Sequence, residues 1–134
     1  MAGSLIKIDE EIVSSAVSSV ELGGSNWDSS YDVYVVQVNQ AETDKTSDNR
    51  LYIRFLASSS PDTSANYDYA SKRLKTNAAF DNDNNTNQTS IDHIMGIDNA
   101  TGNQVNATFY LFNFNESSEY SFMTTEMSTI NSND

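Results

Sequence analysis

The sequence contains no cysteine, a single proline and five glycines among its 134 residues. Without cysteine the chain can form neither a disulfide framework nor a thiolate nucleophile or metal site. It has no apolar run approaching the ~18–20 residues that a membrane-spanning helix needs. Residues 1–11 also lack the apolar stretch of a secretory signal peptide. A disulfide scaffold, a spanning helix and an N-terminal signal are therefore not expected.

Positive charge is scarce. Seven Lys and Arg residues stand against 19 Asp and Glu residues, which gives a formal charge of −12. Phosphate backbones and anionic membrane surfaces are bound by clustered Lys and Arg, so we expect neither nucleic acid nor membrane as a partner. Residues 76–134 contain no Lys or Arg at all. The preferred interpretation is a solvated acidic surface, and the alternative is a surface that meets a basic or cation-bridged neighbour.

Large apolar residues are also few. Leu, Ile, Val and Phe together make 28 residues, whereas Ser, Thr and Asn make 47. This content lies close to the limit of about 20% below which a highly charged chain is usually disordered. A fold in which each strand buries only one face needs few apolar residues, so the composition favours a thin β-structure.

Apolar residues alternate with period two, the pattern of β-strands, in residues 33–38, 51–56, 108–114 and 120–127. Weaker alternation predicts strands at residues 4–8, 16–22 and 91–97. Clusters of turn residues separate them at 23–26, 42–49, 58–65, 81–90 and 99–103, and only residues 66–75 fit a helix and a strand equally. About seven short strands without intervening helices predict an all-β fold. We expect an antiparallel β-sandwich of jelly-roll type that forms a single domain over residues 1–134.

Two of the predicted strands, residues 33–38 and 108–114, are apolar on both faces, which suits strands that are covered on both sides. In a single sandwich of this length the outer face of such a strand is expected to meet a partner. The alternative is an internal cover by residues 66–75. The candidate interface residues are Tyr110, Phe112 and Phe114, together with Val33 and Val35.

The sequence offers little for catalysis. His93 is the only histidine, and it lies in a predicted strand with Asp92 pointing to the other face. A lone histidine in a strand is usually a packing or surface residue. No spacing singles out a pair of carboxylates, and there is no glycine-rich phosphate loop or histidine metal set. We therefore expect a protein that is not an enzyme, with no catalytic residues and no cofactor.

The best metal candidate is a calcium loop at residues 81–85. Asp81, Asp83 and Asn85 match the first three liganding positions of such a loop. The match then fails, because Thr86 replaces the glycine of the sharp turn and Asp92 replaces the bidentate glutamate. The preferred interpretation is a plain polar loop without a metal.

Aromatic residues beside loops offer a different function. Trp27 and Tyr31 flank the start of a predicted strand, where aromatic rings of carbohydrate-binding sandwiches stack on sugars. They are therefore possible glycan contacts, although the same two residues could equally cap the core.

Six segments carry a further signal: SSAVSSV at 14–20, DSSYDVY at 28–34, RF at 54–55, NYDYASK at 66–72, YLFNFN at 110–115 and SSEYSF at 117–122. In this order they resemble a family of virion structural proteins of marine bacteriophages, such as those that infect cyanobacteria and pelagic bacteria. The resemblance covers most of the chain. The resemblance is specific enough to indicate the family, but it is much less specific about the function.

The resemblance implies a non-enzymatic component of the phage particle, a β-sandwich made in the bacterial host cytoplasm and assembled into the virion. Its partners would be other copies of itself and other virion proteins. The preferred role is an exterior capsid decoration or cement protein. The alternatives are a tail-fibre or receptor-binding component, or a carbohydrate-binding module outside any virus. Members of the family continue through further strands, so here the sheet edge after residues 120–129 would be open to a neighbouring subunit.

Overall fold

The computed structural model describes residues 5–28, 30–46, 49–76, 80–97, 99, 102–114, 116 and 118–130. Over these residues the chain is all-β, with nine strands and one short 3₁₀ turn, η1 (Gly24–Asn26). The prediction of an all-β fold is confirmed. In the same residues, no helix is long and apolar enough to cross a membrane.

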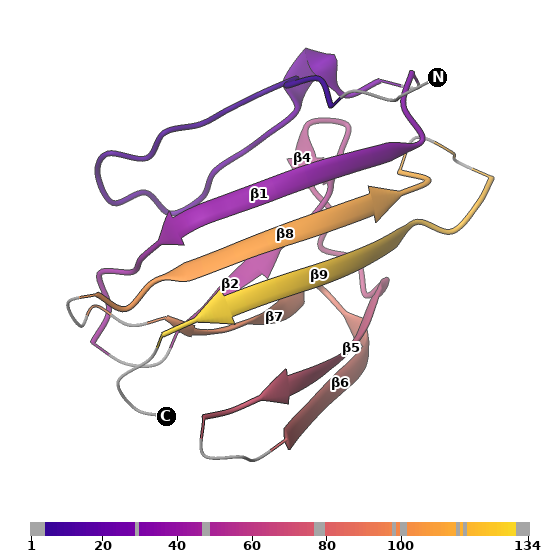
Figure 1. The fold of residues 1–134 in the computed structure, drawn as a ribbon. Helices are drawn as coiled ribbons and strands as arrows, with labels where there is room; N and C mark the ends of the chain where they lie inside the picture. The colour runs from indigo at the N-terminus through magenta and orange to yellow at the C-terminus, as the bar shows by residue number, and fades with distance from the viewer. Residues whose placement is uncertain are drawn as a thin grey trace. The chain divides into compact units, whose positions relative to one another are not determined.

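The strands form four sheets in which paired strands run antiparallel (Figure 1). In chain order they are β1 (Val33–Ala41), β2 (Asn49–Ile53), β3 (Leu56–Ala57), β4 (Ser60–Pro61), β5 (Tyr67–Leu74), β6 (Phe80–Gln88), β7 (Ile91–Ile97), β8 (Val105–Phe112) and β9 (Phe122–Thr129). The three-stranded sheet has the order β1-β8-β9, and the two-stranded sheets are β2-β7, β3-β4 and β5-β6. The pairs β1-β8, β2-β7 and β5-β6 are nested, since each encloses the next along the chain.

The chain divides into two compact units. Unit 1 comprises Met1–Gln37 and Ala107–Glu126, and unit 2 comprises Val38–Asn106 and Met127–Asp134. Buried apolar residues of unit 1 are Tyr34, Ala107, Phe109 and Leu111, and those of unit 2 are Tyr67, Ile91, Ile97 and Val105. Each unit therefore has apolar side chains of its own that are removed from water.

Strand β8 shows why the sequence folds in this way. Its side chains alternate between buried and more exposed along the whole strand, as a period of two residues requires. Val105, Ala107, Phe109 and Leu111 form the buried face. The face that carries Phe109 and Leu111 is thus the core face.

The prediction of a loop at residues 81–90 is wrong, because Phe80–Gln88 is strand β6. The strand has no apolar alternation of its own. It forms because it pairs along its length with β5, from Leu74 opposite Phe80 to Tyr67 opposite Gln88. Residues 66–75, which fitted two structures, accordingly form strand β5.

The predicted strands at residues 4–8 and 16–22 are also wrong. The described residues 5–22, called the N-terminal arm below, contain no strand. Two hydrogen bonds hold the base of the arm: the Gly23 amide donates to Asp9 Oδ2, and the Asn26 side-chain amide donates to the Ile8 carbonyl, both at 2.8 Å. Alternating aliphatic residues are thus present without a partner strand to pair with.

Candidate functional site

An aromatic cluster lies where the N-terminal arm leads into β1. The Trp27 ring stacks on Tyr34, with ring centroids 4.0 Å apart and an interplanar angle of 14°. Phe114 meets Trp27 edge to face at 6.4 Å, and Tyr31 meets Tyr34 in the same manner at 5.9 Å. The Tyr34 ring is buried, and its hydroxyl donates to the Asp28 carbonyl.

The backbone of Gly23 closes this cluster from another side. Gly23 has a φ of +99°, and a Cβ built on it would lie 3.0 Å from Cε3 of Trp27. A side chain at this position would be both strained and crowded. The Trp27 ring thus packs on Tyr34 and beside the Gly23 backbone, and the residue is half-buried.

The candidate interface residues lie in three places. Tyr110, with 38% of its surface exposed, and the half-buried Phe112 share the face of β8 opposite the core. Phe114 instead belongs to the aromatic cluster. On β1, Val33 is 45% exposed and Val35 is half-buried, and their spacing places them on one face of that strand.

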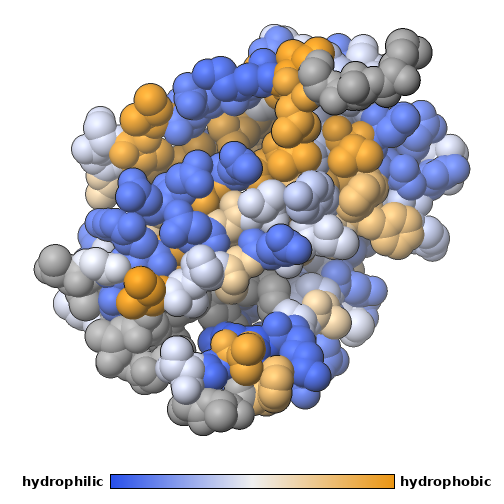
Figure 2. All heavy atoms as spheres, in the orientation of Figure 1, coloured by the Kyte–Doolittle hydropathy of each residue, from blue (hydrophilic) through white to orange (hydrophobic). Residues whose placement is uncertain are grey.

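Apolar residues gather on one end of this sheet. Figure 2 shows them over the end where β1 begins and β8 ends. Phe122, at the start of β9, is 60% exposed, and Tyr120 just before it is more exposed still. Tyr120 and Phe122 were not among the predicted interface residues, although the alternation of residues 120–127 places both on one face of a strand.

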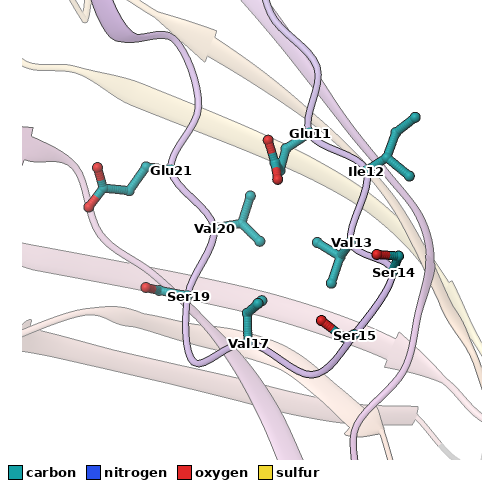
Figure 3. Close-up of a pocket in the computed structure, with 9 residues that line it drawn as sticks. All are labelled: Glu11, Ile12, Val13, Ser14, Ser15, Val17, Ser19, Val20 and Glu21. Carbon is teal, nitrogen blue, oxygen red and sulfur yellow. The ribbon is translucent and has the colours of Figure 1, made fainter.

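The N-terminal arm carries a second apolar surface that sequence reasoning missed. Its exposed aliphatic residues are Leu5, Ile6, Ile12, Val13, Val17, Val20 and Leu22. Within the arm an open hollow of about 380 Å³ is lined by residues between Glu11 and Glu21. Val13, Val17 and Val20 point into it from three sides (Figure 3). In the sequence, this apolar surface was indicated by the alternating spacing of the aliphatic residues, which had predicted strands.

The calcium candidates lie on an extended strand instead of wrapping around a centre. Asp81, Asp83 and Asn85 occupy alternate positions of β6, opposite Arg73, Ser71 and Tyr69 of β5. Asp81 Oδ2 accepts a hydrogen bond from Arg73 Nη2 at 2.6 Å and lies 3.0 Å from Lys75 Nζ.

The hydrogen bond from Arg73, and next that from Lys75, lowers the pKa of the Asp81 carboxyl. The carboxylate is thus neutralised by side chains of the chain itself. Among the side chains that the structure describes, no three or more His, Cys, Asp or Glu residues are grouped so as to hold a metal ion.

A second polar cluster links β2, β5 and β7. Asp92 Oδ2 accepts a hydrogen bond from Arg50 Nη1 at 2.9 Å. The Tyr69 hydroxyl also bonds to the Asp92 carboxylate, and this bond is the main cause of the raised pKa of Tyr69. Asp92 therefore serves as a shared acceptor between strands. The His93 side chain lies outside the described residues.

The far end of the β5-β6 hairpin combines apolar surface with positive charge. Leu74 and Phe80 are cross-strand neighbours, 70% and 62% exposed. Lys72 Nζ lies 5.0 Å from the centroid of the Phe80 ring, within the range of a cation–π contact. Lys72, Leu74 and Phe80 are called the hairpin tip below.

Comparison of the chain with protein-family models, with curated proteins and with solved structures finds no match.

Proposed function

We propose that this chain is a non-enzymatic structural protein of a bacteriophage particle, and specifically an exterior capsid decoration or cement protein. The observation that carries the proposal is the apolar surface on the outer face of the β1-β8-β9 sheet. Tyr110, Phe112 and Val33 belong to it, and Phe122 extends the apolar surface at the start of β9. A protein with this role acts by binding its neighbours in the particle and performs no chemistry on a substrate.

The contrast between charge and surface supports this role. A chain of net charge −12 is well suited to remain soluble, yet it leaves many large apolar side chains exposed. Single exposed apolar residues are ordinary, whereas a contiguous apolar patch rimmed by polar residues is typical of a protein–protein contact. The acidic loops then face the surrounding medium or a cationic neighbour while the apolar face is covered.

The sheet edges support it as well. In the order β1-β8-β9, strands β1 and β9 lie at the two ends of the sheet among the described residues. An edge strand presents N–H and C=O groups that pair with a further strand if one is offered. In an assembled particle a neighbouring subunit covers such an edge.

The finer fold assignment belongs to the same proposal. We assign a jelly-roll sandwich because the strand pairs are nested, β1 with β8, β2 with β7 and β5 with β6. Nested pairs arise when one long hairpin is rolled up on itself, which is the connectivity of a jelly roll. The fold alone does not fix the role, so the test must address assembly.

The test is to place a charge on the outer face of β8. In phage that encode Phe112→Asp or Tyr110→Asp, we expect a folded protein by circular dichroism that is absent from purified particles. Tyr52→Asp, at an exposed position of β2 outside this surface, is the matched control and should be incorporated normally. Normal incorporation of both β8 variants would overturn the proposed contact. Immunogold labelling on the tail instead of the capsid would replace the decoration role by the tail role.

A further inference from the structure

The hollow of the N-terminal arm has an apolar interior and an acidic end. Val13 and Val20 face each other from the two limbs of the arm, and Val17 closes the bottom (Figure 3). Glu11 and Glu21 line the opposite, open end, and the Glu21 carboxylate points away from the hollow (Figure 3). The volume of about 380 Å³ lies near the lower limit of the ~300–1,000 Å³ typical of small-molecule pockets. The hollow therefore suits one or two apolar side chains that carry a positive charge beside them.

The hairpin tip has this chemistry. Leu74 and Phe80 project next to each other, and Lys72 holds its ammonium group over the Phe80 ring. Residues 72–81 contain three of the seven basic residues of the chain and a single acidic residue, so their net charge is +2. The arm, residues 5–22, contains one basic and four acidic residues, so its net charge is −3.

We infer that the hairpin tip of one copy docks into the arm hollow of a second copy of this chain. Leu74 and Phe80 cover Val13, Val17 and Val20, while Lys72 approaches the carboxylate of Glu11. The tip and the hollow are different surfaces of one chain, so the contact is heterologous: repeated, it generates a ring or an open chain of subunits. The inference rests on the proposed role in assembly but uses none of the residues on the outer face of β8.

Charge reversal with mixing tests the pairing. In analytical ultracentrifugation, Lys72→Glu and the double variant Glu11→Lys/Glu21→Lys should each weaken self-association by more than about tenfold. Mixing the two variant chains should restore association, because each then supplies the charge that the other lost. Self-association equal to that of the unmodified chain in both variants would overturn the inference. So would a mixture of the two variant chains that associates no more strongly than either variant alone.

Cross-linking tests the geometry without relying on charge. Because the chain has no cysteine, Leu74→Cys in one chain and Val17→Cys in another provide the only two thiols. We expect a disulfide-linked heterodimer on mild oxidation. Leu56→Cys, at an exposed leucine of β3, is the control for Leu74→Cys and should give no more product than random collision. Equal yields from the two leucine positions would overturn the inference.

The two proposals fail separately. If the tip and hollow variants self-associate normally while Phe112→Asp is excluded from particles, the docking inference is wrong and the proposed function stands. If instead the tip and hollow variants alone lose association and Phe112→Asp is incorporated normally, the β8 contact is wrong and the tip docking stands.

Discussion

The aromatic cluster of unit 1 and the β5-β6 hairpin of unit 2 keep their structure by different means. In unit 1 the rings of Trp27 and Tyr34 stack, with Phe114 at the edge of Trp27, and Phe109 and Leu111 of β8 are buried. In the β5-β6 hairpin of unit 2 the strands are tied by polar contacts, above all from Arg73 to Asp81. A chain with few apolar residues thus concentrates them in some places and relies on ladders of hydrogen bonds and ion pairs in others. Substitutions should therefore have unequal effects in these two regions.

The largest effect is expected in the buried face of β8. Phe109→Ala leaves a cavity where an aromatic ring was buried, and we expect a loss of about 3–5 kcal/mol in the free energy of unfolding. Urea denaturation followed by circular dichroism measures it. Phe122→Ala makes the same chemical change at an exposed position and should cost far less. Equal losses would show that β8 does not provide the core face.

The aromatic cluster can be disturbed from its backbone side. Gly23→Ala combines a positive φ with a Cβ that would be 3.0 Å from the Trp27 ring, so we expect a loss of about 1–3 kcal/mol. Gly24→Ala is the matched control: its φ is also positive, but no atom lies within 4 Å of its added Cβ. Thermal unfolding of the two variants separates crowding from strain. If Gly24→Ala is destabilised as much as Gly23→Ala, backbone strain alone explains the loss of stability and crowding against Trp27 adds nothing.

In unit 2 the hydroxyl of the buried residue Tyr67 allows a test of how much hydrogen bonds contribute to stability. The Tyr67 hydroxyl accepts a hydrogen bond from the Phe55 amide at 3.1 Å and donates to the Asp62 carbonyl at 3.2 Å. Tyr67→Phe removes both bonds and leaves a backbone amide without this acceptor, so we expect a loss of about 1–2 kcal/mol in urea denaturation. Tyr52→Phe, at an exposed tyrosine of β2, should change stability little. A loss as large in the control would contradict the role of the two hydrogen bonds.

The strands that the sequence predicts correctly are those with apolar alternation. Strand β8 is the clearest case, because it buries every second side chain and period two is visible in its residues. Strand β6 was missed because Asp and Asn are depleted in strands generally. Here they are held by the partner strand, and Arg73 opposite Asp81 is not apparent from residues eight positions apart in the chain.

For the N-terminal arm the sequence led to the opposite error, because it predicted strands where the described residues form none. Its aliphatic residues alternate well enough to predict strands, but no partner strand pairs with residues 5–22 in the described part of the chain. For the same reason the hollow could not be predicted, because it depends on how Val13 and Val20 are brought together by the anchor between Asp9 and Gly23. The sequence places Trp27 at the start of a predicted strand, whereas its stacking on Tyr34 depends on how the chain folds.

The smallest effect is expected from the ion pairs of the β5-β6 hairpin, and it is visible as a pH dependence. The hydrogen bonds from Arg73 and Lys75 lower the pKa of Asp81 below its ordinary value of 3.8. As the pH falls, the unfolded chain therefore takes up this proton before the folded chain does. The stabilisation is complete above about pH 4 and is lost as the pH falls through the lowered pKa of the folded chain.

Asp81→Asn should accordingly flatten the decline in the free energy of unfolding between about pH 4 and pH 2, measured by urea denaturation. Asp62, whose pKa is lowered chiefly by the hydrogen bond from the Ser64 hydroxyl, titrates in both chains and so cancels in the comparison. The difference should shrink in 1 M salt, where the Debye length is about 3 Å. If the free energy of unfolding declines with equal slope in the two chains at low salt, the ion pair of the hairpin adds nothing to stability. The contrast between the hairpin and the aromatic cluster would then rest on backbone pairing alone.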